Sequence, residues 1–209
     1  MVVLLNCSFR GEKSNSNYFL GLLEQQLDVP CERISLAKMK NFGELKSKLT
    51  EADALVLGMP LYVDSVPAQV IDLMERLYEE KSEELKKLHV YVVTNLGFYE
   101  ASQTKIELAV VKNWCDKMGM TYGGGLAIGA GEMMGSLRNV PADQGPNREM
   151  GEGLKTLATA IKERAAIEDI YTEPTGFPRR MYLMAAQMNW APQAKKFGNK
   201  KRDILRKRP

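Results

Sequence analysis

Short apolar runs that alternate with amphipathic segments are the feature of this sequence that most restricts its fold. The apolar runs cover residues 2–6, 31–35, 54–58, 89–94 and 122–128. Segments with helical periodicity cover residues 17–27, 44–50, 67–79, 103–118 and 147–167. Because continuous apolar runs suit strands that are covered on both faces, this alternation predicts an α/β fold with a parallel sheet and helices on each side.

The chain length suits one domain with an extension. At 209 residues the chain can bury a sizeable core without disulfides. We place the domain at residues 1–167 and the extension at 168–209, because a turn-rich stretch at 171–178 follows the last helical segment. Apolar residues in the next segment, 181–190, spread around the helix, which predicts burial against the chain's own domain or a partner subunit.

The formal net charge of +3 comes from the C-terminus. Residues 195–209 carry eight basic residues and one acidic residue, so the remainder has 21 basic and 25 acidic residues and a net charge of −4. The basic tail contains no recognisable nucleic-acid-binding module. This favours a solvated or subunit-contacting tail and argues against a nucleic acid partner.

Cysteine usage and hydropathy indicate the compartment. Cys7, Cys31 and Cys115 are widely separated and form no C-x-x-C pair, which argues against a disulfide framework and against zinc or iron–sulfur sites. No run approaches the roughly 18 apolar residues of a membrane span, and the apolar start is too short for a signal peptide. We therefore expect a soluble, cytoplasmic protein with no metal and no membrane contact.

The loop after the first apolar run gathers groups that suit a phosphate. Residues 8–16 are polar and lead into a helical segment, so hydroxyls and backbone N–H groups lie where a helix N-terminus favours an anion. The loop has neither the Walker spacing nor the dinucleotide spacing, which leaves a site for one terminal phosphate, as on a mononucleotide. The alternative is that Ser14, Asn15 and Ser16 only cap the helix.

Two further loops follow the third and fourth predicted strands. Tyr62, after the third strand, can lie flat against a planar ring or can be an ordinary half-buried loop tyrosine. After the fourth strand, Asn95 can hydrogen-bond the polar edge of such a ring, and Gly97 permits close backbone approach. Because ligands of open parallel sheets bind outside the carboxyl ends of the strands, we expect the three loops to form one site.

Two other features are excluded as active-site motifs. The glycine-rich run at residues 123–135 gives G-x-G-x-x-x-G at Gly129, Gly131 and Gly135, which is not the dinucleotide spacing. We expect this run to form one wall of the site or a subunit contact. His89 is the one histidine and has no Ser or Cys partner nearby, so a histidine-based hydrolase is not expected.

Taken together, residues 6–16, 52–62 and 95–100 resemble the NAD(P)H-dependent FMN reductase branch of the flavodoxin-like superfamily, over roughly residues 1–165. The resemblance implies a flavodoxin-like three-layer α/β sandwich with a five-stranded parallel sheet in the order 2-1-3-4-5, followed by a C-terminal extension. Cys7 and Phe9 stand where this family more often has Gly-Ser-Pro, so this loop departs from the family pattern. The compact cysteine cluster of related iron–sulfur flavoproteins is absent from the sequence.

The resemblance also implies the cofactor and its site. The FMN phosphate would be held by Ser8, Arg10, Ser14, Asn15 and Ser16. The isoalloxazine would be lined by Pro60, Leu61, Tyr62 and Val63, and its site completed by Asn95, Gly97, Phe98 and Tyr99.

The expected activity is that of an FMN-dependent NAD(P)H oxidoreductase. Since the flavin itself accepts and releases hydride, we expect no catalytic side-chain nucleophile and a ping-pong sequence. Electrons would pass from NADPH or NADH to a small-molecule acceptor: a quinone, flavin, azo or nitro compound. We expect a homodimer. The alternatives are an electron-carrier flavodoxin without turnover of its own, and a flavin-free scaffold that interacts through its tail.

Overall fold

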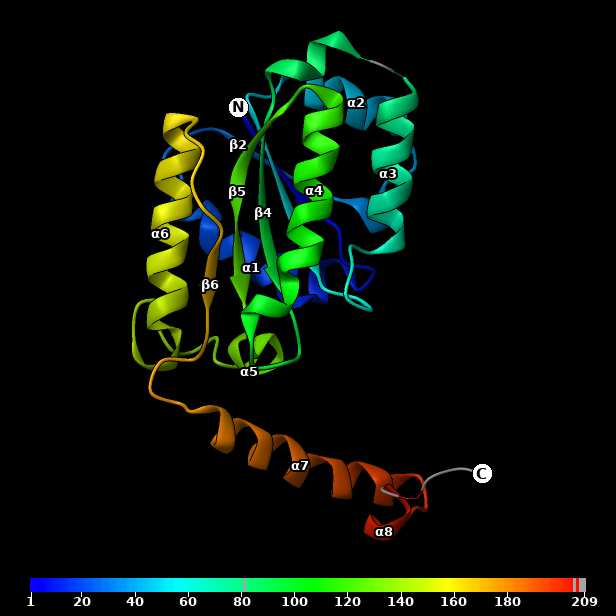
Figure 1. Cartoon of the computed structure of the whole chain (residues 1–209), viewed down its shortest axis with the longest axis vertical. Helices are drawn as coiled ribbons and strands as arrows, with labels where there is room; N and C mark the ends of the chain where they lie inside the picture. Colours follow the sequence, from blue (N-terminus) through cyan, green and yellow to red (C-terminus); the bar gives the residue numbers. More distant parts are fainter. Residues whose placement is uncertain (81, 205, 207–209) are drawn as a thin grey trace.

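The computed structural model describes residues 1–80, 82–204 and 206, and its centre is a six-stranded parallel sheet (Figure 1). The strand order is β2-β1-β3-β4-β5-β6. The strands are β1 (Val2–Asn6), β2 (Cys31–Ser35), β3 (Ala54–Pro60), β4 (His89–Asn95), β5 (Thr121–Ile128) and β6 (Ile170–Thr172). All five pairings are parallel, so the predicted fold and the order 2-1-3-4-5 are confirmed for the first five strands.

The predicted number of five strands is wrong, because β6 adds a sixth at the outer edge. Ile170 pairs with Leu126 of β5, and the Gly129 amide donates to the Thr172 carbonyl at 2.9 Å. Asp169, just before β6, accepts hydrogen bonds from the Tyr122 hydroxyl at 2.7 Å and the Gly125 amide at 2.9 Å. A strand of three residues is too short to produce a recognisable apolar run, so its sequence reads as a linker.

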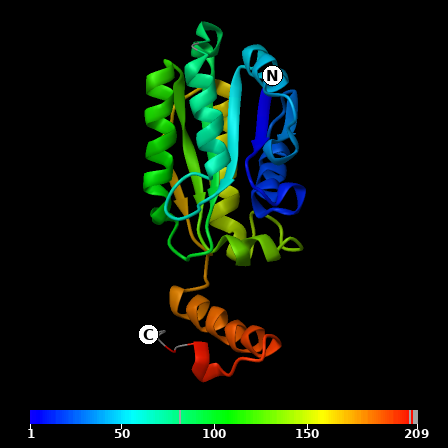
Figure 2. The same ribbon diagram turned by 90° about the vertical axis from the view of Figure 1, so that its right-hand side faces the viewer.

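Helices cover both faces of the sheet (Figures 1 and 2). One face carries α2 (Phe42–Glu51), α3 (Ala68–Glu79) and α4 (Lys105–Met118). The other carries α1 (Asn15–Glu24), α5 (Gly131–Ser136) and α6 (Arg148–Glu163). Each face has its own buried apolar cluster, which explains why the central strands are apolar at successive positions and not only at alternate ones.

The glycines of β5 are explained by packing. A Cβ on Gly123 would lie 2.2 Å from the ring of buried Tyr91, and one on Gly125 would lie 2.7 Å from Leu108. The Tyr91 hydroxyl donates to the carbonyls of Ala160 and Ala165, at 3.0 and 2.9 Å, and so joins β4 to the end of α6. This half of the glycine-rich run therefore admits neighbouring side chains into the core.

The C-terminal helices extend away from the domain, on the side of the carboxyl ends of the strands (Figures 1 and 2). They are α7 (Arg179–Lys196) and α8 (Lys201–Ile204). Burial against the chain's own domain, one of the two alternatives predicted for this segment, is wrong, because Met188 is 74% exposed and Trp190 60% exposed. Among the described residues, no helix combines the length and hydropathy needed to span a membrane.

Candidate functional site

The three predicted loops meet at the carboxyl edge of the sheet and enclose a cavity of about 100 Å³. Ten of the predicted site residues line it: Ser8, Arg10, Ser14, Asn15, Ser16, Pro60, Leu61, Tyr62, Asn95 and Gly97. Leu96 and Glu132 complete the lining. The loops come together because β1, β3 and β4 are neighbours and end at the same edge, where ligands of such sheets bind.

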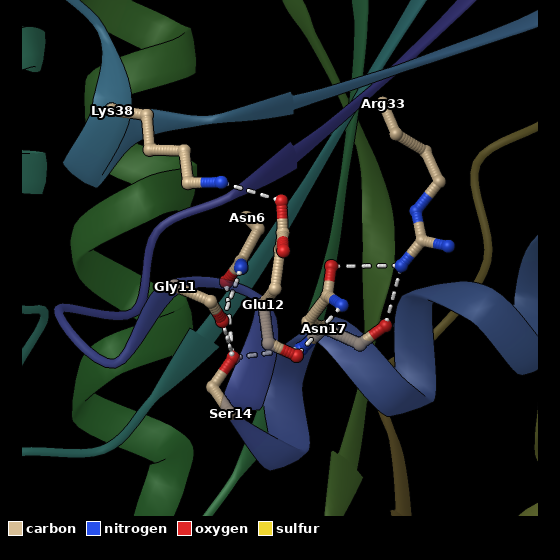
Figure 3. Close-up of polar contacts among 7 residues, drawn as sticks. All are labelled: Asn6, Gly11, Glu12, Ser14, Asn17, Arg33 and Lys38. Carbon is tan, nitrogen blue, oxygen red and sulfur yellow. Dashed lines mark hydrogen bonds and ion pairs between the residues drawn. The ribbon is translucent and has the colours of Figure 1, made fainter.

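Buried Asn6, the last residue of β1, shapes the first loop from inside (Figure 3). Its amide nitrogen donates to the Gly11 carbonyl at 2.9 Å, and its side-chain oxygen accepts from the Ser8 amide at 3.1 Å. Gly11 has a φ of +56°, which a glycine adopts without strain. Asn6 therefore holds the loop in the curve that brings Ser8 and Arg10 to the cavity.

Charged side chains brace the outside of the same loop (Figure 3). Lys38 pairs with Glu12 at 2.6 Å. Arg33 of β2 donates from Nη2 to both the carbonyl and the side-chain oxygen of Asn17, at 2.7 and 2.8 Å. The side-chain nitrogen of Asn17 in turn donates to the backbone carbonyl of Glu12 at 3.1 Å. The loop is therefore fixed from both sides by contacts within the chain.

Ser14 is the N-cap of α1. Its hydroxyl oxygen accepts from the backbone N–H of Asn17 at 3.0 Å, and its O–H group donates to the Gly11 carbonyl at 2.7 Å. Capping is thus an observed role of Ser14, although the residue also lines the cavity. The Asn15 and Ser16 amides belong to the first turn, where N–H groups have no partner within the helix and are available to an anion.

Arg10 supplies positive charge at the mouth of the cavity. Its guanidinium lies 3.8 Å from Glu132 of α5, and both side chains are largely exposed. An exposed pair of this length contributes little to stability, so a bound anion can draw the guanidinium away from the carboxylate. Glu132 follows the carboxyl end of β5, just as the residues of the other loops follow the carboxyl ends of β1, β3 and β4.

Asn95 joins the three loops. Its buried side chain donates to the Ser16 hydroxyl at 2.8 Å and to the Met59 carbonyl at 3.1 Å. Its own carbonyl accepts from the Leu61 amide at 2.9 Å. The loops after β1, β3 and β4 are therefore one hydrogen-bonded unit, and the amide of Asn95 acts as its centre.

The loop after β3 makes a tight turn at the edge of the cavity. Tyr62 and Ser65 exchange two backbone hydrogen bonds of 3.1 Å. Val63 and Asp64 between them have φ values of +50° and +57°, which are unfavourable for a β-branched residue such as valine. Tyr62 lines the cavity with 40% of its surface exposed, so it is neither buried in the core nor covered by its neighbours.

Val63, Phe98 and Tyr99 do not line the cavity. Val63 is 98% exposed and Phe98 is 62% exposed, so both project from the rim. Tyr99 faces the C-terminal segment, where its hydroxyl donates to the Phe177 carbonyl at 3.0 Å. Asn6 and Leu96 are site residues that sequence reasoning missed, whereas Glu132 lies in the glycine-rich run that was expected to form one wall of the site or a subunit contact. Each of them lies at, or just beyond, the carboxyl end of a strand.

A protonated carboxyl group lies under the loop that follows β4. Glu107 of α4 is completely buried, and its Oε2 accepts from the Thr94 hydroxyl at 2.5 Å. Burial raises the pKa of Glu107 to about 8, and burial also raises the pKa of the Cys7 thiol, with a smaller contribution from Glu107 when that carboxyl is ionised. At neutral pH the site therefore rests on a largely uncharged layer, since Cys7 and Thr94 directly precede two of its loops.

A larger cavity, of about 670 Å³, lies beside β2. Most charged side chains that line it are already paired: Lys38 with Glu12, and Lys48 with Glu32 at 2.5 Å and with Glu44 at 3.2 Å. We assign the functional site to the smaller cavity because it has the first turn of α1, the strand-end loops and an open rim. No cluster of three potential metal-ligating side chains occurs among the residues that the structure describes.

Comparison with known proteins identifies a family for the part of the chain that contains these loops. The family described as NADPH-dependent FMN reductase matches residues 1–132, a stretch that holds every residue lining the cavity. Comparison of the chain with curated protein sequences finds no significant match.

Several solved structures share the fold. A flavodoxin from Streptococcus pneumonia TIGR4 superposes with a TM-score of 0.56 at 14% identity, over 78% of this chain and 99% of its own. An NADPH-quinone reductase from P. pentosaceus gives 0.53 at 17% identity, over 75% and 95%. An azoreductase from Bacillus anthracis gives 0.54 at 14% identity, over 78% and 98%. At these identities the similarity shows the fold alone.

Proposed function

The chain belongs to the NADPH-dependent FMN reductase family, and from this premise we propose that the cavity between its three loops holds the phosphate end of FMN, with the ring at its open side, and that the site serves electron transfer to a planar, apolar acceptor such as a quinone or an azo compound. The family makes the protein an oxidoreductase with FMN as cofactor and NAD(P)H as electron donor. The observation that carries the assignment of the site is the convergence of ten family-implied residues on one cavity.

The residues present fit the phosphate end of FMN. The first-turn amides of Asn15 and Ser16, the Ser8 hydroxyl and the Arg10 guanidinium surround the cavity and can all donate to an anion. The side-chain nitrogen of Asn15 donates to the Gly131 carbonyl at 3.1 Å. A Cβ on Gly135 would lie 2.2 Å from the side-chain oxygen of Asn15. Gly135 thus leaves the space that Asn15 needs to form this wall.

The residues present also fit a planar ring at the open side. A Cβ on Gly97 would meet nothing within 4 Å, so the loop after β4 leaves free space there. Tyr62 offers a partly exposed aromatic surface on the other loop. We propose that the ring lies between these two loops, with Pro60 and Leu61 beneath it and Asn95 fixing the spacing.

When bound, FMN supplies the hydride chemistry, and the chain supplies position and electrostatics. Asn95 holds the two ring-facing loops at a fixed separation through its bonds to Ser16 and Met59. The titratable side chains that line the cavity are Arg10, Tyr62 and Glu132, and no nucleophile–base pair occurs among the described lining residues. We infer that the donor and then the acceptor use the same open face in turn.

The rim favours a planar, apolar acceptor. Phe9, Val63 and Phe98, one on each loop, are 58%, 98% and 62% exposed. Exposed apolar groups next to a site are typical of a surface that receives an apolar ligand. The NADPH-quinone reductase and the azoreductase of similar fold are named for acceptors of this kind, which supports the proposal without deciding between quinone and azo compounds.

The assay is anaerobic reduction of the purified protein after reconstitution with FMN. We expect the flavin absorbance to bleach on addition of NADPH or NADH, and to return when a naphthoquinone is added. A protein that takes up no FMN, or whose bound FMN stays oxidised with both nicotinamides, would contradict the proposed activity. The second of these results would identify an electron carrier.

We also propose a cytoplasmic location. The three cysteines, Cys7, Cys31 and Cys115, are all free thiols, and two of them are buried. Unpaired cysteines are common in reducing compartments. Fractionation of cells that produce the protein tests this location.

A further inference from the structure

We propose that the C-terminal arm, residues 179–204, docks on a second copy of this chain and brings its basic end to the mouth of the partner's site. The docking is independent of the activity proposed above, whereas the role of the basic end rests on that proposed function.

The root of the arm, residues 179–182, is fixed to the loop after β4, residues 97–100. Arg179 pairs with Glu100, and the Tyr182 hydroxyl donates to the Gly97 carbonyl. The rings of Tyr99 and Tyr182 pack with their centroids 5.7 Å apart. Beyond Tyr182, no hydrogen bond or ion pair of the described residues joins α7 to the domain. The arm therefore has a defined starting direction but no cover from its own chain.

Apolar side chains occupy two opposite sides of the uncovered helix. Met181, Met184 and Met188 recur at the spacing of one helix face and are 51%, 63% and 74% exposed. Leu183 and Trp190 lie on the opposite face, with 38% and 60% exposed. Exposure of this much apolar surface is unfavourable in water, so contact of both faces with another protein surface would be favourable.

The arrangement of these two apolar faces argues against binding of the arm to a lipid membrane. A helix that lies on a membrane needs one apolar face and one polar face. Here the two apolar faces are opposed, so a flat bilayer would leave one of them in water. A folded protein can cover both, because a second body and a second arm can pack on different sides of the same helix.

Charge favours a second copy of the same chain. Residues 179–209 contain ten basic residues and one acidic residue, whereas residues 1–178 contain 19 basic and 25 acidic residues. Residues 179–209, the arm with the C-terminal residues after it, therefore carry a net charge of +9, and residues 1–178 carry −6. The body of each copy is thus opposite in net charge to the arm of the other copy, which favours reciprocal docking in an isologous twofold pair.

Several acidic side chains lie near the arm's root. Glu149 and Glu173 line a second cavity with Tyr99, and burial together with Glu173, Glu149 and Glu100 raises the pKa of the Tyr99 hydroxyl. Glu132 lies on the cavity of the proposed flavin site itself. Among the described lining residues of these two cavities, Arg10 is the one Lys or Arg, and it is paired with Glu132.

The mouth of the proposed flavin site, lined by Arg10 and Glu132, is poorly suited to a dinucleotide unless positive charge is added. NAD(P)H carries several negative charges on its phosphates, and acidic side chains repel them. The arm's own basic end cannot serve its own site, because α7 has 18 residues and a helix of that length spans ~27 Å away from its root. In a twofold pair, by contrast, Lys195, Lys196 and the residues beyond them can reach the partner's mouth.

The docking is tested by sedimentation of the full-length holoprotein. We expect a dimer for the wild type and a monomer for Met184→Glu/Met188→Glu, whose substitutions lie on one exposed face and leave the core unchanged. Tyr78→Glu is the matched control, since Tyr78 is 49% exposed but lies at the far end of α3. A wild-type monomer, or a double variant that stays dimeric, overturns the proposal. Wild-type monomers that bind anionic vesicles would assign the arm to a membrane.

The role of the basic end is tested by Lys195→Glu/Lys196→Glu. We expect the KM for NADPH to rise at least tenfold while FMN affinity stays the same. Mixing this variant with Arg10→Ala, whose arm is intact, should restore part of the low KM, because mixed pairs combine an intact site with an intact arm. An unchanged KM overturns this role. Absence of any turnover in the wild type would contradict the proposed activity but leave the sedimentation result valid.

Discussion

Arg10 is the cationic side chain that lines the site, so its removal measures the phosphate contact most simply. We expect Arg10→Ala to weaken FMN binding about tenfold, because a charge-assisted hydrogen bond contributes roughly 1.5 kcal/mol when the group is partly exposed. Quenching of flavin fluorescence in a titration gives the affinity.

Two comparisons make the Arg10 measurement specific. Lys13→Ala removes a neighbouring positive charge that does not line the cavity, and should change the affinity little. Riboflavin, which has no phosphate, should bind Arg10→Ala and the wild type equally. An equal loss for FMN and riboflavin would contradict the phosphate contact and indicate that the loop has been disturbed.

Val63 is a strained residue whose side chain makes little contact. With a φ of +50° and 98% of its surface exposed, it adopts an unfavourable conformation without any packing in return. We expect Val63→Asn to raise the free energy of unfolding by about 1 kcal/mol, because asparagine tolerates this region. Urea denaturation measures the change. Val63→Ile keeps the β-branch and should give no gain, and a destabilised asparagine variant would contradict the assignment of strain.

Between elements, the contact of α4 with β4 predicts a pH dependence. Glu107 has a pKa of about 8 in the folded protein, above its usual value near 4.5, because it is buried. From the usual value to pH 8 the unfolded chain loses this proton while the folded protein keeps it. This group therefore contributes most to stability at low pH, and its contribution falls by a few kcal/mol as the pH rises to about 8.

Glu107→Gln removes this titration and keeps a partner for Thr94. We expect the free energy of unfolding of the variant, relative to the wild type, to increase steadily between pH 5 and pH 8. Denaturation at several pH values measures this difference, in which the other titrating groups cancel. A difference that is constant across the range would contradict a neutral Glu107.

Among the strands and helices, some could be predicted from the sequence and others could not. The strands β1, β3 and β4 were predictable because burial on both faces makes them nearly continuous apolar runs, whereas β6 has only three residues and lies at the edge of the sheet beside β5, where Asp169 hydrogen-bonds the Gly125 amide. The short α5 was missed for a related reason. It begins within a glycine-rich run, with Ala130 at a φ of +50°, and carries no helix signal of its own.

The site was predictable where position alone decides it. Residues at the carboxyl ends of parallel strands converge whatever their side chains, which places Ser8, Pro60 and Asn95 in one cavity. Side-chain direction is not fixed by this rule. Tyr99 follows the same strand as Asn95 but packs against the arm, and that contact comes from residues 177–182, far along the chain.

For the whole molecule, a ligand that binds only the folded state must stabilise it. We expect FMN at 100 times its Kd to contribute about 2.7 kcal/mol and to raise Tm by roughly 5–10 °C for a domain of this size. Differential scanning calorimetry with increasing FMN measures the shift. Riboflavin at equal concentration should give a smaller one, and an unchanged Tm with FMN would contradict binding to the folded chain.

A crystal structure of the FMN complex tests the central claim most directly. We expect the phosphate at the first turn of α1, within hydrogen-bonding distance of Ser16 and Arg10, and the ring between Tyr62 and Gly97. FMN bound in the larger cavity beside β2, or bound with its phosphate away from α1, would contradict the account.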